Sequence, residues 1–284
     1  MKVSAVIITC NEAHNLRKTL NQLYWCDEIV VVDSFSTDET VEICSQFGCK
    51  VFQRVFDGYG TQKRFAVEQA SHDWILSLDA DEYLTWDLAQ EIQHELCANP
   101  EIVGYELPMN LVFRNYEFRH GKESNRFFLR LFNRNFGGMS ADKVHEGIHV
   151  NGPVKKLKNI ILHYSYRDTH HYFSKMNRYT AYGAEMAHAK GKKKSMFFIA
   201  ISVPFYFFKY YILERNILNG ENGFYWAAFN SYYHFVKYIK TRDLELNEMS
   251  DLGIPLNSNY LLKNATSKET FTVSVPQLIS TGNN

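Results

Sequence analysis

Two carboxylates, Asp79 and Asp81, directly follow the apolar run Trp74-Ile75-Leu76-Ser77-Leu78, and Glu82 stands beside them. Residues two apart on extended backbone point to the same side, so a strand ending here would present both aspartates together. Oxygen ligands in this arrangement suit Mg²⁺ or Mn²⁺, which keep water ligands and share their coordination shell with phosphates. The residues therefore predict a site for a metal and a diphosphate, with a solvated acidic turn as the alternative.

Apolar and amphipathic segments alternate over the first hundred residues. The expected strands are 3–8, 28–32, 50–54 and 74–78, and the expected helices are 15–23, 39–47 and 61–70. Strands that alternate with helices in this way predict a parallel α/β sheet with crossover helices. Such sheets bind ligands beyond the carboxyl ends of their strands, which is where Asn11, Asp33 and Asp79 fall. We therefore expect these three side chains to meet at one edge of the sheet.

Beyond the first hundred residues the pattern of expected secondary structure changes twice. Residues 104–163 have an irregular strand pattern, and the pattern beyond residue 168 is helical. The final residues are rich in Ser, Thr and Asn, which is typical of a loose polar tail. We therefore expect three regions, which are an α/β ligand-binding domain at 1–165, a basic and aromatic helical region at 166–245, and a tail at 246–284.

The segment 196–213 is strongly apolar, although Pro204 and Lys209 interrupt it. Its length is at the short limit for a helix that crosses a bilayer. Its Phe and Ile residues recur at helical spacing, which favours an amphipathic helix lying in a membrane interface. The cluster Lys190-Gly191-Lys192-Lys193-Lys194 precedes it, as expected of a protein docked on anionic lipid. Alternatively, these aromatic residues and those of a second expected helix at 224–239 form only the core of a helical subdomain.

Charge is divided unevenly along a chain whose formal net charge is zero. Residues 1–100 hold 16 acidic and 7 basic side chains, a net charge of −9, whereas residues 155–242 hold 4 acidic and 15 basic side chains, a net charge of +11. The basic region predicts an anionic partner, and we favour a membrane surface over nucleic acid because no recognised nucleic-acid-binding module accompanies the charge. The five cysteines lack paired spacing and no charged-then-apolar leader opens the chain, so we expect reduced thiols and a cytoplasmic protein.

Three motifs, in this order and spacing, carry a resemblance to a known family. They are Ile7-Ile8-Thr9-Cys10-Asn11-Glu12, Val32-Asp33-Ser34-Phe35-Ser36-Thr37-Asp38-Glu39-Thr40 and Leu78-Asp79-Ala80-Asp81-Glu82. Over residues 1–245 the chain resembles the family 2 inverting glycosyltransferases, and more narrowly the bacterial lipopolysaccharide core glucosyltransferases that add β-glucose to heptose. The resemblance implies a GT-A fold, which is a Rossmann-like mixed sheet flanked by helices. It also implies a UDP-sugar donor, Mg²⁺ or Mn²⁺, and a lipid-linked inner-core acceptor at the cytoplasmic face of the inner membrane.

The resemblance places donor binding on residues from all three motifs and from two other segments. These residues are Thr9, Asn11, Glu12, Asp33, Lys63, Arg64, Asp79, Ala80 and Arg130. We expect Asp33 to be exposed and to accept the uracil imide hydrogen, with a helix N-cap as its alternative role. Capping is also the alternative for Asn11 and Glu12. The cations of Lys63 and Arg64 could reach the diphosphate or lie on an exposed helix face, and the family often has Asn where this chain has Arg64.

Arg126 and Arg130 share one face of the segment 126–132. They could hold acceptor phosphates or the donor diphosphate, or they could flank a core strand.

Inversion at an anomeric carbon requires a carboxylate that takes the proton of the acceptor hydroxyl. Val144-His145-Glu146 matches the family motif of the acceptor region, so Glu146 is the expected base and Asp142 its rival. We expect Asp81 to coordinate the metal, and Asp79 to contact the ribose or a metal-bound water. His145 and His163 are further candidate metal ligands, although a lone histidine is more often structural.

Two other functions compete with glycosyl transfer. A haloacid-dehalogenase-type phosphatase also places Asp-x-Asp after a strand, but it needs Thr or Val where Tyr83 stands, and its nucleophile usually lies on the first strand. A catalytically inactive nucleotide-sugar binder that serves as a membrane scaffold would keep Asp33 and Asp81 but would need no base.

Overall fold

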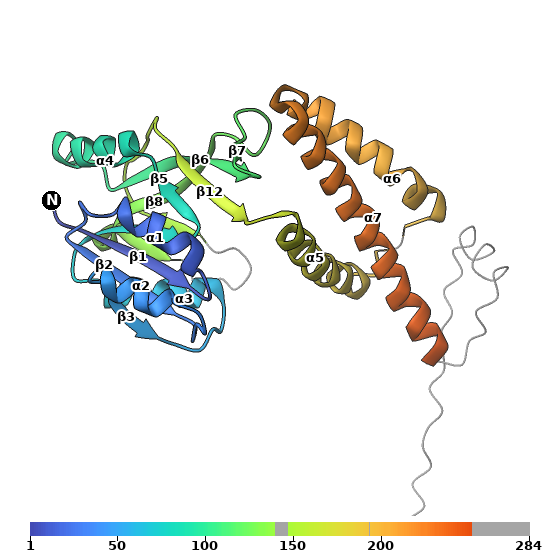
Figure 1. The fold of residues 1–284 in the computed structure, drawn as a ribbon, viewed down its shortest axis with the longest axis horizontal. Coiled ribbons are helices and arrows are strands. Elements are labelled where there is room, and N and C mark those ends of the chain that lie inside the picture. Colours follow the sequence, from blue (N-terminus) through green and yellow to red (C-terminus); the bar gives the residue numbers. More distant parts are fainter. Residues whose placement is uncertain (140–146, 193, 252–284) are drawn as a thin grey trace, which may run out of the picture.

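The structure is a computed structural model that describes residues 1–139, 147–192 and 194–251, with only the backbone described at 249–251. A sheet domain carries an arm of helices at one end (Figure 1). In the described residues the strands are β1 (Val3–Thr9), β2 (Glu28–Asp33), β3 (Lys50–Gln53), β4 (Trp74–Asp79), β5 (Glu82–Leu84), β6 (Gly104–Phe113), β7 (Tyr116–Glu117), β8 (Arg126–Asn133), β9 (Gly137–Met139), β10 (Ile148–Val150), β11 (Val154–Lys156) and β12 (Ile161–Tyr166). The helices are α1 (Ala13–Asn21), α2 (Thr40–Gln46), α3 (Tyr59–Gln69), α4 (Trp86–Ala98), α5 (Thr169–Ala189), α6 (Met196–Phe208) and α7 (Gly220–Asp251), with shorter helical turns at Arg134–Phe136, Lys209–Leu213 and Asn216–Asn219.

The main sheet is mixed, with the strand order β3-β2-β1-β4-β8-β6-β12-β5. The first four strands of the chain run parallel to one another, whereas β8 is antiparallel to both β4 and β6. The register pairs Thr9 with Asp33 and Ile8 with Asp79. The expected meeting of the strand ends is therefore confirmed, because β1, β2 and β4 all finish at the same edge.

Both faces of the parallel strands are buried, as crossover helices require. Val3, Ala5 and Ile7 pack in one cluster with Leu16 of α1, whereas Val6 packs on the other face with Ala66 of α3. Alternate residues of a strand point to opposite faces, so a single apolar strand supplies both cores. This packing fixes the direction in which each strand end presents its polar residues.

Glu28 is a buried carboxylate at the opposite edge of the sheet from these strand ends. Its side chain is 5% exposed and accepts hydrogen bonds from the Ser71 amide and hydroxyl, each at 2.7 Å, and it also pairs with Lys50. Burial raises the pKa of this carboxyl, but the bonds from Lys50, Ser4 and Ser71 outweigh burial and hold the pKa at about 2. The charged form is therefore stabilised by folding.

Glu28→Gln is expected to lower the free energy of unfolding by about 2 kcal/mol at neutral pH, a value reduced because Lys50 is exposed. The folded-state pKa lies below the unfolded value of 4.5, so this contribution is full above pH 4.5 and is lost as the pH falls towards 2. Urea unfolding of both proteins along a pH series measures it. A stability difference that did not shrink in acid would contradict this account.

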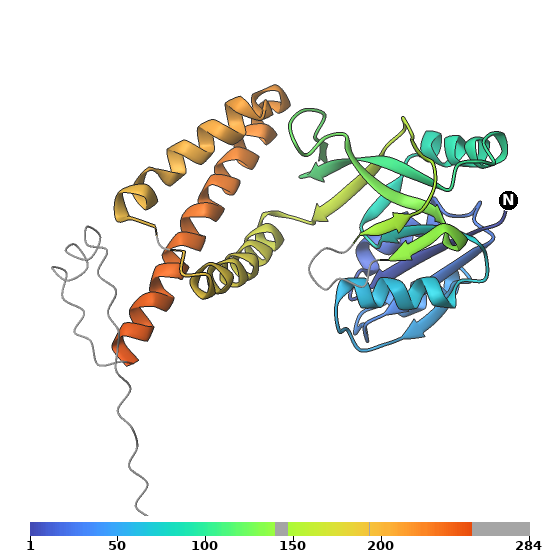
Figure 2. The same cartoon turned by 180° about the vertical axis from the view of Figure 1, so that it is seen from behind.

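A third core joins the helical arm, which Figure 2 shows from behind, to the sheet domain. Phe113 at the end of β6 and the nearby Phe118 pack against Tyr172 and Met176 of α5 and Trp226 of α7. The Phe113 and Trp226 ring centroids are 5.7 Å apart. Aromatic residues of α5 and α7 therefore form a subdomain core, which was one of the two alternatives for the aromatic region.

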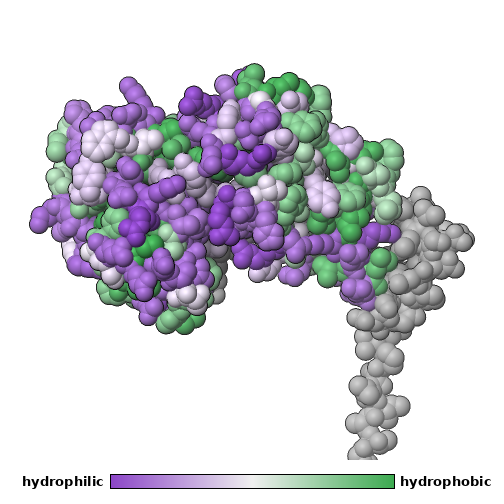
Figure 3. Space-filling view, in the orientation of Figure 1, coloured by the Kyte–Doolittle hydropathy of each residue, from purple (hydrophilic) through white to green (hydrophobic). Residues whose placement is uncertain are grey.

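Helix α6 differs from α5 and α7 in that little of it is buried. Within the described residues, Met196–Leu213 is the one segment that is long and apolar enough by length and composition to cross a membrane, and 11% of it is buried. Five of its exposed apolar side chains recur at helical spacing, and they are Phe197, Ile201, Phe205, Phe208 and Ile212. We call these five residues the apolar stripe, and green hydrophobic surface covers much of the arm in Figure 3.

Candidate active site

The loops after β1 and β2 are bonded to each other at the edge where the strands end. Asn11 adopts a left-handed conformation with φ +57°, which Asn tolerates better than most residues. Its amide donates to Ser36 Oγ at 2.8 Å, and its Oδ1 accepts from the Thr37 amide at 2.8 Å. The Glu12 amide donates to Thr40 Oγ1 at 2.9 Å. Asn11 therefore holds the neighbouring loop, and neither it nor Glu12 caps α1 with its side chain.

Asp33 contradicts our expectation of an exposed carboxylate, because it is fully buried. One carboxylate oxygen accepts from the Ser36 amide at 2.9 Å, and the other accepts from the Ser36 hydroxyl. The alternative N-cap role is also wrong, since α2 begins at Thr40 and Asp38 bonds the Thr40 amide instead. Asp33 shapes the loop, and its complete burial leaves it without a surface open to a nucleobase in this structure.

Thr9 and Ala80 are also buried at this edge. The Ala80 carbonyl accepts from Thr19 Oγ1 at 2.7 Å, which ties the acidic segment to α1. The Thr9 hydroxyl has no hydrogen-bond partner in the described part of the chain. Buried polar groups are nearly always bonded, so this hydroxyl is a donor that a ligand at the strand ends could use.

Asp79 lies between two cations. Lys63 Nζ, on the first turns of α3, is 2.6 Å from Asp79 Oδ1, and Arg130 Nη2, on β8, is 3.3 Å from Asp79 Oδ2. Arg130 also pairs with Glu82, whose side chain is 1% exposed. Burial raises the pKa of Asp79, but Lys63 and Arg130 outweigh it and hold the pKa well below its usual range. Burial raises the pKa of Glu82 despite the same arginine.

Asp81 faces a different partner. The strand ends at Asp79, and Ala80 and Asp81 form a turn, so the argument from extended backbone stops at Asp79. Asp81 Oδ2 lies 3.5 Å from His163 Nε2, because β5 and β12 pair with Glu82 opposite His163. Burial lowers the pKa of His163, but the Asp81 carboxylate outweighs it and raises the pKa. The two aspartates that we expected to act together are thus engaged by separate groups.

The donor set suits a metal that takes few protein ligands. No group of three or more His, Cys, Asp and Glu side chains that could hold a metal occurs among residues 1–139, 147–192 and 194–248. Asp81 and His163 supply one carboxylate and one imidazole, which Mn²⁺ accepts. Mg²⁺ sites likewise use one or two carboxylates, with waters and substrate phosphates completing the shell. These residues therefore fit a metal that arrives with a diphosphate, and not a closed protein cage.

A cavity of about 290 Å³ opens beside Lys63 and Arg130. Side chains of β8, including Phe127 and Phe128, line it together with residues of α3, β6, β9 and β10. Arg130 Nε is buried without a hydrogen-bond partner in the part of the chain that the structure describes. The cavity thus combines aromatic walls with two cations, as a site for a polar ligand does.

The remaining expected residues divide into two groups. Glu146, Asp142 and His145 lie outside the described residues, although Met139 and Gly147, which bracket that segment, both line the cavity. Arg64 is described and half-buried, and nothing in the structure tests its diphosphate role.

Sequence reasoning did not identify Ser36 as the partner of Asp33 or Glu82 as the partner of Arg130. Ser36 had a local signal, since an Asp commonly bonds backbone and side chains a few residues on in a turn. Glu82 had none, because Arg130 is distant along the chain.

Comparisons with known proteins agree with the resemblance that the three sequence motifs carry. Residues 4–154 match the family model described as glycosyl transferase family 2. An uncharacterized glycosyltransferase of Rickettsia bellii is 31% identical over 86% of this chain and 87% of its own length. LpsC of Rhizobium meliloti, a lipopolysaccharide core biosynthesis glycosyltransferase, is 31% identical over 83% of this chain and 90% of its own length.

The similarity to solved structures covers less of the chain, and the sequence identity is lower than for these two relatives. S. aureus TarS in complex with UDP-GlcNAc aligns with a TM-score of 0.31 and 22% identity, over 40% of this chain and about a third (35%) of that chain. This likeness supports no functional argument. The family match and the mixed sheet flanked by helices confirm the fold class that the three motifs implied.

Proposed function

We propose, from the premise that this chain belongs to glycosyltransferase family 2 and is a glycosyltransferase, that it moves a hexose from a UDP-sugar to a lipopolysaccharide inner-core heptose. Glucose is the first candidate sugar, and the reaction inverts the anomeric carbon. One observation carries the proposal. The register of β1 with β2 and β4 brings the Asn11, Asp33 and Asp79 motifs to one edge of the sheet, where α/β folds bind nucleotides.

The donor would lie across this edge. The loop that Asp33 and Ser36 shape would receive the uridine, and the Thr9 hydroxyl is a buried donor that the nucleotide could engage. Lys63 would turn from Asp79 to the diphosphate, since its side chain already lines the cavity. Arg130 would offer its unpaired Nε while its terminal nitrogens stay on Glu82 and Asp79.

A divalent metal held by Asp81, with His163 as a second ligand, would neutralise charge on the leaving UDP as a Lewis acid. Glu146 is the proposed base that takes the proton of the acceptor hydroxyl, and Asp142 is its rival. The position of Met139 and Gly147 on the wall of the cavity supports this assignment, since the two residues bracket the segment that contains both carboxylates. His145 is a further candidate ligand on the same segment.

The acceptor and the cellular location of the enzyme are proposed from evidence other than the strand register and the cavity. LpsC, a protein of lipopolysaccharide core biosynthesis, is similar along most of both chains, which supports an inner-core acceptor. Such acceptors are lipid-linked, so the enzyme would work at the cytoplasmic face of the inner membrane as a peripheral protein. The net charge of +11 in residues 155–242 and the exposed apolar stripe support that location.

A donor screen tests the proposed reaction. Purified protein is incubated with UDP-glucose, UDP-galactose or UDP-N-acetylglucosamine and a heptose-terminated core acceptor, and UDP release is measured with Mg²⁺, Mn²⁺ or EDTA. We expect turnover with UDP-glucose, and loss of turnover in EDTA that either metal restores. UDP binding without turnover for any sugar and acceptor would favour a nucleotide-sugar-binding scaffold. Turnover with another acceptor would move the proposal to a different lipid-linked glycan or peptide.

A further inference from the structure

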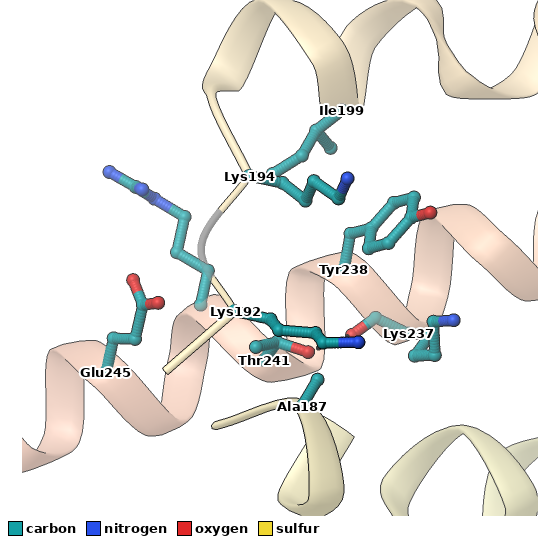
Figure 4. A pocket seen from close by; sticks show the side chains of 9 residues that line it. Ala187, Lys192, Lys194, Ile199, Lys237, Tyr238, Thr241 and Glu245 are labelled. Carbon is teal, nitrogen blue, oxygen red and sulfur yellow. Dashed lines mark hydrogen bonds between the residues drawn. The ribbon is translucent and has the colours of Figure 1, made fainter. Parts of the chain in front are cut away.

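A second cavity, of about 220 Å³, lies among α5, α6 and α7, away from the strand ends (Figure 4). Four of its lining side chains are basic, and they are Lys192, Lys194, Lys237 and Arg242. One carboxylate, Glu245, also lines the cavity. We call this site the basic cavity. In Figure 4, Lys192 and Lys194 reach from the segment before α6 across to α7, where Lys237 and Tyr238 lie.

The positive charge of the basic cavity is not balanced within the described residues. None of the ion pairs among the described residues involves the four basic side chains of the cavity. Lys194 lies instead over the ring of Phe198, at 4.4 Å from the centroid, and Lys237 lies 5.2 Å from the centroid of Tyr238. Four cations and a single carboxylate line one small space, so the cations repel one another.

The repulsion among these cations affects the pKa of Lys237. Burial lowers its pKa, and the neighbouring Lys194 and Lys192 lower it further. A bound anion would remove the repulsion and favour the charged form of Lys237. Phosphate oxygens suit the site, because lysine and arginine donors both form strong charge-assisted bonds with them.

The surroundings of the basic cavity distinguish a lipid phosphate from a soluble one. Ile199 of α6 lines the cavity, and the apolar stripe begins two residues earlier at Phe197, which is 75% exposed. The stripe continues along α6 through Phe205, which is 55% exposed. An apolar surface next to a cluster of cations matches the boundary between acyl chains and anionic headgroups.

We propose that the basic cavity binds the phosphate of an anionic lipid headgroup while the apolar stripe enters the acyl boundary beside it. The inference rests on the proposed membrane location of the enzyme, but not on the identity of its donor or acceptor. It gives the helical arm a defined lipid site in place of general attraction to a charged surface. The arm would thereby hold the sheet domain close to a lipid-linked acceptor.

Flotation of the full-length protein with vesicles tests the lipid site. We expect binding to vesicles of phosphatidylcholine mixed with phosphatidylglycerol, and little binding to phosphatidylcholine alone. The variant Lys192→Gln/Lys194→Gln/Arg242→Gln should bind the mixed vesicles about a hundredfold less tightly, at roughly 1 kcal/mol per cation. Thermal unfolding of the variant should match the wild type, because the lost cations form no ion pairs in the described residues.

A charge-matched control separates a site from diffuse attraction. Lys158→Gln/Arg178→Gln/Lys190→Gln removes three exposed cations of the same basic region that do not line the cavity. This control should lose less than about tenfold. Equal losses in the two triple variants would show that surface charge alone drives binding, and would overturn the basic cavity as a site.

Two further measurements identify the source of the phosphate. Phe197→Gln/Phe205→Gln should weaken vesicle binding while leaving the four cations in place. If that variant bound vesicles normally and titration with inorganic phosphate saturated the basic cavity, the site would take a soluble anion and the lipid proposal would fail. Retention of the wild type in membranes through an alkaline carbonate wash would indicate a spanning helix, and would also overturn the interfacial arrangement.

Activity on a deacylated, soluble core acceptor keeps this inference separate from the proposed reaction. We expect the basic-cavity triple variant to transfer sugar to that acceptor as the wild type does. Normal vesicle binding by the triple variant with normal transfer would refute the lipid site alone. Absence of transfer by the wild type would refute the reaction alone.

Discussion

Replacing Glu146 by Gln is expected to lower kcat by about 10²–10⁴-fold, the usual contribution of a general base. Glutamine keeps the shape of the side chain but cannot take the proton of the acceptor hydroxyl. Affinity for UDP should be unchanged, because the proposed UDP contacts lie on Thr9, Lys63 and Arg130. Turnover assays and calorimetric titration with UDP, performed on the same preparation, separate the two effects.

Asp142→Asn is the matched control for the base assignment. It removes one carboxylate from the same segment between Met139 and Gly147, so any general effect of lost charge appears in both variants. We expect Asp142→Asn to retain most of the turnover. If Asp142→Asn lost turnover and Glu146→Gln kept it, the roles would be reversed. If both kept it, neither carboxylate would be the base.

Arg130→Met is expected to lower the free energy of unfolding by about 3–5 kcal/mol, because it leaves a buried charge without its partner. Glu82 is 1% exposed and pairs with Arg130, whereas Asp79 keeps its second cation, Lys63. The decrease in the free energy of unfolding should be smaller at acidic pH. Burial already raises the pKa of Glu82 above the unfolded value of 4.5, so protonation at low pH removes the unpaired charge. Urea unfolding along a pH series measures both effects.

Two matched variants show whether Arg130 acts through Glu82. Arg130→Met/Glu82→Gln should recover most of the stability, since the buried carboxylate is gone, but it should not recover UDP affinity. Lys63→Met should weaken UDP binding with less loss of stability, because its partner Asp79 is 31% exposed and keeps Arg130. A double variant as unstable as Arg130→Met would show that the arginine stabilises the fold in another way.

Much of the fold was predictable because it depends on local pattern. Apolar runs such as Val30–Val32 mark strands that helices cover on both faces, and parallel strands put their carboxyl ends at one edge. The meeting of the ends of β1, β2 and β4 at one edge followed from that rule alone and is confirmed by the register. The apolar helix at 196–213 was likewise predictable from composition and spacing.

The orientation of the acidic side chains was not predictable in the same way. We expected Asp33 to be exposed, but the bonds that it accepts from Ser36 turn it inward. We expected Asp79 and Asp81 to point together, but a turn at Ala80 directs them to different partners. The pattern of parallel strands predicts which residues lie at the edge of the sheet. The direction of a side chain beyond the last strand residue depends on the geometry of the loop.

The family, the alternation of strands and helices up to residue 78, and the three motifs that meet at one edge of the sheet could be predicted from the sequence alone. Tertiary structure decided which charges neutralise one another. Arg130 reaches Glu82 because β8 lies beside β4, and His163 reaches Asp81 because β12 pairs with β5. It also decided that aromatic residues of α7 are buried while the stripe of α6 is exposed. The physical reason is that local propensity acts between neighbours in the chain, whereas burial and ion pairing act between neighbours in space.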